Sequence, residues 1–150
     1  MPQIQFTERE LEDYLFNDNA LHDNLHIRPV ARQVRTPNGV IDIVGINTVT
    51  NEWYVIELKK DILDASAFFQ VEKYWHYMNM TKPRQFHKLI VGQRLHQDLH
   101  HAVSLYDMVD DTTSHFRTKY ALFGMTFDDP ISFSWRDTAQ VAISKGEGYE

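Results

Sequence analysis

The chain has 150 residues, of which 43% are hydrophobic and 13% aromatic, so we expect one packed domain over residues 1–150. It contains no cysteine, which excludes a disulfide framework, a thiolate metal site and an iron–sulfur cluster. Its net charge of −6 argues against a protein that binds nucleic acid tightly through charge alone.

The first predicted element is a helix over residues 7–18. Thr7 and Glu10 have the spacing of a capping box, in which each side chain bonds to the backbone N–H of the other residue. Phe6 can pack against Leu11, and Leu15 extends the same apolar stripe one turn later. The helix should therefore bury one face.

Three strands are predicted to follow. Residues 30–36 and 40–46 read as a β-hairpin around Pro37-Asn38-Gly39, a strong turn signal. Residues 53–59 (Trp-Tyr-Val-Ile-Glu-Leu-Lys) form the third strand. We expect the three to pair as neighbours in one sheet.

A second helix is predicted from an Asp64 cap to about Met80, where Lys82-Pro83 ends it. Its helical spacing indicates one core stripe and a second face. The core stripe comprises Phe68, Val71, Trp75 and Met78, and the other face carries Gln70, Tyr74 and Tyr77.

The remainder is predicted as a strand at 88–92, a helix at 97–108, and strands at 120–127, 131–135 and 140–144, with a frayed tail after them. This order favours an α/β fold with a central mixed β-sheet flanked by helices. It corresponds to an αβββαβ core followed by a C-terminal α/β extension.

Two carboxylates and a lysine are placed to form a metal site. Side chains two apart on a strand share a face, so Glu57 and Lys59 point the same way. Asp42 lies on the neighbouring hairpin strand, within reach of that face if the strands pair. Carboxylate oxygens suit Mg²⁺ or Mn²⁺, and such an ion beside a lysine can support phosphodiester hydrolysis. Glu8 or Glu12 could complete the ligand set if the first helix packs across the sheet.

The same residues resemble the PD-(D/E)xK nuclease superfamily over residues 6–92. The motifs are Gly39-Val40-Ile41-Asp42-Ile43-Val44-Gly45, then Val55-Ile56-Glu57-Leu58-Lys59, then Gln70-x-x-x-Tyr74. The last is similar to the Gln-x-x-x-Tyr motif of the RecB-like branch, and the whole set looks closest to the nuclease domain of NucS enzymes. The resemblance implies a restriction-endonuclease-like fold.

The resemblance also implies roles. Asp42 and Glu57 would bind the metal, Lys59 would assist the attacking water, and Gln70 and Tyr74 would support the site and touch the nucleic acid. Glu8 would be the acidic residue that the first helix often adds to the metal ligands. The resemblance does not cover the separate N-terminal DNA-binding domain of NucS enzymes, so it carries no mismatch specificity.

The sequence therefore predicts a Mg²⁺- or Mn²⁺-dependent deoxyribonuclease acting on DNA, of the kind found in DNA repair or in phages and mobile elements. Arg32 and Arg35 are candidate phosphate contacts, although one of them could instead pair with an acidic residue across the hairpin. The alternative is a non-catalytic nucleic-acid-binding or assembly module with the same fold.

A homodimer, or a subunit of a larger complex, is a further alternative for the assembly. No apolar run reaches membrane-spanning length, and the first residues lack the profile of a signal peptide. We therefore expect a cytoplasmic protein with no membrane contact.

Overall fold

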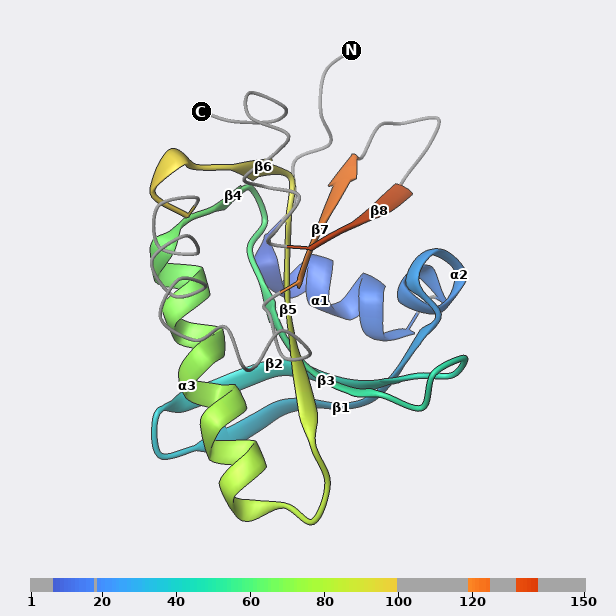
Figure 1. Cartoon of the computed structure of the whole chain (residues 1–150). Coiled ribbons are helices and arrows are strands. Elements are labelled where there is room, and N and C mark those ends of the chain that lie inside the picture. Colours follow the sequence, from blue (N-terminus) through green and yellow to red (C-terminus); the bar gives the residue numbers. More distant parts are fainter. Residues whose placement is uncertain (1–6, 18, 100–118, 125–131, 138–150) are drawn as a thin grey trace.

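The fold was analysed in a computed structural model that describes residues 7–17, 19–99, 119–124 and 132–137 (Figure 1). Its elements in chain order are α1 (Glu8–Asn17), α2 (Ala20–Leu25), β1 (Ile27–Thr36), β2 (Gly39–Asn47), β3 (Trp53–Leu58), β4 (Ile62–Leu63), α3 (Ala65–Thr81), β5 (Phe86–Gly92), β6 (Arg94–Leu95), β7 (Lys119–Gly124) and β8 (Ser132–Asp137). No described helix is long and apolar enough to cross a membrane.

One six-stranded sheet organises the molecule, in the order β1-β2-β3-β5-β7-β8. The first three strands are antiparallel neighbours, β3 and β5 pair in parallel, β5 and β7 also pair in parallel, and β8 returns antiparallel to β7. A mixed sheet is what the sequence predicts. The short strands β4 and β6 form a second, parallel pair beside the ends of β3 and β5.

Helices cover both faces of the sheet, and each face has its own core (Figure 1). Beneath α3 lies a cluster that includes Phe68, Val71 and Val55. Beneath α1 and α2 lies a second cluster, which includes Leu11 and Ile56. β3 contributes to both because its side chains alternate between the two faces. This central position brings the end of β3 close to α1.

The capping residues in the sequence correctly predicted where α1 and α3 begin. The capping box of α1 is confirmed, because the Thr7 hydroxyl accepts from the Glu10 N–H at 3.1 Å and Glu10 accepts from the Thr7 N–H at 3.1 Å. Asp64 caps α3 by accepting from the Ala67 N–H at 3.0 Å. The proposed contact of Phe6 with Leu11 lies outside the described residues.

Several elements differ from the prediction. The helix α2 and the strands β4 and β6 were not predicted, and β1 begins three residues early, at Ile27. Of the helix predicted at 97–108, only residues 97–99 are described, and they are helical. β7 and β8 correspond to the strands predicted at 120–127 and 131–135, whereas the strand at 140–144 lies outside the described residues.

The predicted faces of α3 need one correction. Tyr74 was assigned to the non-core face, yet it is only 4% exposed and belongs to the core cluster under α3. Trp75, assigned to the core stripe, is half-buried at its border. Tyr74 is buried because the β1–β2 hairpin folds over it, a contact that helical periodicity cannot reveal.

Candidate active site

A pocket of about 240 Å³ opens where the first turns of α1 meet the sheet. Its lining residues are Glu8, Arg9 and Glu12 of α1, Gln33 of β1, Asp42 of β2, and Glu57, Leu58 and Lys59 at the end of β3. The structure thus brings together four of the predicted site residues, from segments far apart in the sequence. These four are Glu8, Asp42, Glu57 and Lys59.

Asp42 and Glu57 form a close carboxyl pair. Asp42 is oriented by the Leu58 N–H, which donates to its Oδ2 at 2.8 Å. Glu57 is only 7% exposed. Its burial, followed by the hydrogen bond with Asp42 and the charge of Asp42, raises the pKa of Glu57 to about 9, against an opposing effect of Lys59. At neutral pH and without a cation, the pair therefore holds a proton.

This pair fits a divalent cation. Two carboxylates in contact, of which Glu57 is buried and Asp42 is half-buried, repel each other when both are ionised, and a bound cation removes that repulsion. Within the described part of the chain, no three or more His, Asp or Glu side chains gather closely enough to hold a metal ion. Mg²⁺ is often held by only one or two carboxylates, with water and substrate phosphate completing its shell. Asp42 and Glu57 are sufficient for such a site.

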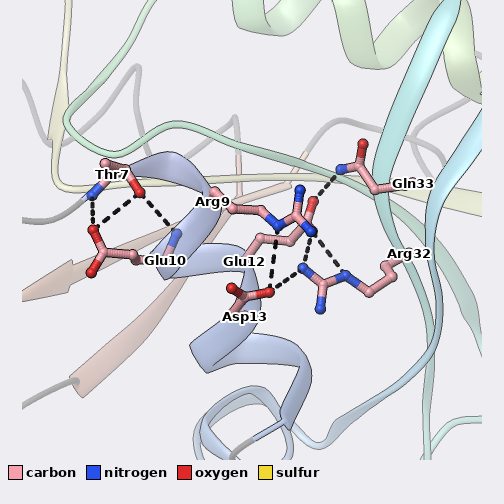
Figure 2. Close-up of polar contacts among 7 residues, drawn as sticks. All are labelled: Thr7, Arg9, Glu10, Glu12, Asp13, Arg32 and Gln33. Atoms are coloured by element: carbon pink, nitrogen blue, oxygen red, sulfur yellow. Dashed lines mark hydrogen bonds and ion pairs between the residues drawn. The ribbon is translucent and has the colours of Figure 1, made fainter.

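Glu12 is held as a structural carboxylate, as Figure 2 shows. It is 3% exposed, its Oε2 accepts from Arg32 Nε at 2.9 Å and from Arg32 Nη2, and its Oε1 accepts from Gln33 Nε2. The structure therefore favours a structural role for Glu12 over the role of extra ligand that the sequence allowed. Glu8 forms no hydrogen bond or ion pair with the other described residues.

Of the two arginines predicted to contact DNA, neither lines the pocket. Arg32 pairs with Glu12 and Asp13 of α1, rather than with an acidic residue across the hairpin, and its guanidinium also lies over the Phe16 ring at 5.2 Å. Arg35 is exposed on β1. Arg32 thus fastens α1 to the sheet, while Arg35 is open to solvent.

Gln70 and Tyr74 lie under the β1–β2 turn instead of lining the pocket. Gln70 Nε2 donates to the Asn38 carbonyl at 3.3 Å. Gly39 has a φ of +130°, and a Cβ there would come within 2.9 Å of the Tyr74 hydroxyl and 3.3 Å of Gln70 Nε2. The two side chains therefore support the turn from which β2 runs to Asp42. Contact with nucleic acid stays a prediction for both.

Two pocket residues were missed by the sequence reasoning. Gln33 adopts a left-handed backbone, with a φ of 51° in the middle of β1. Non-glycine residues seldom take this conformation, which is often retained at functional sites. Arg9 follows Glu8 directly and reaches the pocket from α1. Its position next to a predicted ligand was the only signal in the sequence, and Gln33 offered none.

Most of the sequence matches a known protein family. Residues 7–111 match the family described as the endonuclease NucS C-terminal domain, which is more than half of the chain. The chain belongs to this family. The resemblance to a NucS-type nuclease domain, predicted from the motifs, is therefore confirmed.

Individual proteins are also similar to this chain. Endonuclease NucS of Methanocaldococcus jannaschii is 30% identical over 74 residues, covering 49% of this chain and 27% of that protein. A repair endonuclease from Pyrococcus abyssi superposes with a TM-score of 0.56 at 17% identity, over 70% of this chain and 46% of that one. A structure titled EndoMS-dsDNA2 complex gives a TM-score of 0.57 at 16% identity, over 69% and 44% of the two chains.

The chain thus spans less than half the length of these relatives. At such low identity, the solved structures support the fold alone. They confirm the predicted α/β class with its central mixed sheet.

Proposed function

We propose that this domain is a Mg²⁺- or Mn²⁺-dependent DNA nuclease. The observation that carries the proposal is the pair of contacting carboxyl groups of Asp42 and Glu57 beside Lys59, in a pocket of a NucS-family domain. A structural acid pair would be expected to have a permanent basic partner, as Glu12 has in Arg32. Asp42 and Glu57 instead share a pocket that a cation and a phosphate can enter.

The chemistry divides among the residues as follows. When bound to Asp42 and Glu57, a divalent ion supplies Lewis acidity toward the scissile phosphate and toward a water molecule. Asp42 is kept in place by the Leu58 N–H. The Lys59 ammonium would stabilise the charge that develops on the phosphate oxygens and orient the attacking water. Glu8, which lines the same pocket without being clustered with the other two carboxylates, would contribute to the metal site through a bound water.

The substrate is proposed to be DNA. One relative is named a repair endonuclease and another is titled as a complex with double-stranded DNA, which supports a role in DNA repair. A cytoplasmic location is part of the same proposal. Exposed Arg35 would contact the phosphate backbone, while Arg32 would contribute by holding α1 in place. Gln70 and Tyr74 would preserve the hairpin, and half-buried Gln70 is the one of the two that would reach the nucleic acid, because Tyr74 is buried.

Lys59→Ala is the decisive variant for this proposal. Supercoiled plasmid, linear duplex, single strand, flap and four-way junction DNA would be incubated with Mg²⁺, Mn²⁺ or EDTA. The matched control is Lys60→Ala, because Lys60 is the next residue, is exposed and does not line the pocket. We expect metal-dependent cutting by wild type and by Lys60→Ala, and a loss of at least about 100-fold in Lys59→Ala.

The opposite results have a clear meaning. If wild type cuts none of these substrates with either metal, or if Lys59→Ala cuts as fast as Lys60→Ala, this site is not catalytic. The non-catalytic binding or assembly module is then the better account. Gel filtration at micromolar concentration would separately show whether the chain forms the homodimer that the sequence left open.

A further inference from the structure

Arg9 is a pocket residue to which no role has yet been assigned. It projects from the first turn of α1, its side chain is 74% exposed, and it lines the pocket together with Glu8 and Lys59. In the part of the chain that the structure describes, Arg9 and Lys59 are the two cationic side chains that line this pocket.

The ion pair that Arg9 makes is a loose one. Its Nε lies 3.6 Å from Oδ1 of Asp13, on the next turn of the helix. The same oxygen lies 2.5 Å from Nη2 of Arg32, so Arg32 is its closer partner (Figure 2). The hydrogen bond from Arg32 is also the largest cause of the lowered pKa of Asp13. Asp13 would therefore keep a partner if Arg9 turned toward an anion.

The charge of the pocket explains why a second cation is needed. Four carboxylates line it: Glu8, Glu12, Asp42 and Glu57. Arg32 balances Glu12, and a metal ion would balance the Asp42–Glu57 pair. A DNA strand still brings several phosphates into an acidic surrounding, and Lys59 can neutralise only the one at the reaction centre. An arginine can bind a further phosphate through two parallel N–H···O bonds.

We propose that Arg9 binds a phosphate adjacent to the scissile one, forming a second phosphate position on the α1 wall of the pocket. This proposal rests on the proposed nuclease function for its substrate. The phosphate position differs from the nuclease reaction because it concerns binding of DNA, and binding can be measured without cleavage. When the DNA strand enters the pocket, the Arg9 guanidinium would turn from Asp13 to the phosphate, and Asp13 would remain paired with Arg32.

The test is the salt dependence of DNA binding. A fluorescently labelled duplex would be titrated with the 150-residue chain, and binding would be followed by fluorescence anisotropy between about 50 and 250 mM NaCl. Ca²⁺ would replace Mg²⁺ in this titration so that binding is measured without cleavage. The variants are Arg9→Gln and Arg9→Lys. The control is Lys73→Gln, which removes one exposed positive charge from α3, away from the pocket lining.

We expect Arg9→Gln to weaken binding about tenfold at low salt and to reduce the slope of log Kd against log salt by about 0.9, the value for one lost phosphate contact. Arg9→Lys should keep the slope and lose part of the affinity, since an ammonium cannot bind bidentately. Lys73→Gln should leave the slope unchanged. An unchanged slope in Arg9→Gln, an equal change in Lys73→Gln, or a wild type that does not bind would overturn the proposal.

Cleavage kinetics separate this proposal from the nuclease function. If wild type cuts DNA, Arg9→Gln should raise KM with little change in kcat, and a loss confined to kcat would contradict a binding role. If wild type binds with an Arg9-dependent slope and cuts nothing, the nuclease function fails and the phosphate position stands. Unchanged thermal unfolding of Arg9→Gln would confirm that α1 remains folded, because glutamine is a good helix former.

Discussion

Replacing Glu57 by glutamine should stabilise the metal-free protein at neutral pH, although it removes a proposed metal ligand. Burial and the neighbouring Asp42 raise the pKa of Glu57 from 4.5 to about 9. Between these values, the folded protein keeps a proton on Glu57 that the unfolded chain has released. Wild-type stability therefore falls as the pH rises through this window. Glutamine does not titrate, so the variant should lack this slope.

The size of the stability difference depends on how many pH units lie above the ordinary pKa of Glu57 and below its raised pKa. Each pH unit contributes at most about 1.4 kcal/mol to the free energy of unfolding. At about pH 7.5, three units above the ordinary pKa of a glutamic acid, the variant should gain up to about 4 kcal/mol over wild type, and at about pH 5 the two should nearly agree. Urea unfolding in EDTA at a series of pH values measures this difference directly.

With Mg²⁺ present, wild type should become more stable than Glu57→Gln, the reverse of the order expected without metal. A divalent ion displaces the shared proton, so Mg²⁺ should stabilise wild type and release close to one proton, while Glu57→Gln should gain far less. Calorimetry in two buffers of different ionisation enthalpy counts that proton. Asp23→Asn is the matched control, because it removes an exposed carboxylate that does not line the pocket and leaves the Asp42–Glu57 pair in place. Two results in EDTA would refute the reasoning. One is that the free energy of unfolding changes with pH in the same way for wild type and Glu57→Gln, and the other is that Glu57→Gln is less stable than wild type at about pH 7.5.

Three other variants test the frame around the site, each by urea unfolding. Gly39→Ala should lose about 2 kcal/mol, since its φ of +130° and its 2.9 Å approach to Tyr74 leave no room for a Cβ; wild-type stability would contradict the supporting role of Tyr74. Arg32→Met should lose about 3 kcal/mol by leaving buried Glu12 without its cation, and the double variant with Glu12→Gln should recover part of that loss. Asp64→Ala should lose about 1 kcal/mol with the N-cap of α3, and no loss would show that the cap bond is unimportant.

The sequence determined those parts of the protein that depend on neighbours along the chain. The capping box of Thr7 and Glu10, the cap at Asp64 and the hairpin turn before Gly39 are local hydrogen-bonding or backbone preferences, so short segments suffice to predict them. The ordered motifs also predicted the family, because Asp42, the Glu57-x-Lys59 triplet and the Gln70-x-x-x-Tyr74 motif resemble those of the NucS-type nuclease domain. The structure places Asp42, Glu57 and Lys59 in one pocket.

The tertiary structure alone decided which polar side chains are free to act. Glu8 and Glu12 lie one turn apart on α1, and helical spacing treats them alike. The packing of α1 against β1 commits Glu12 to Arg32 and Gln33, and leaves Glu8 open to the pocket. The burial of Tyr74 and the parallel pairing of β4 with β6 are likewise contacts between distant segments. Periodicity records the face on which a residue lies, whereas its partner on that face is set by the element that packs there.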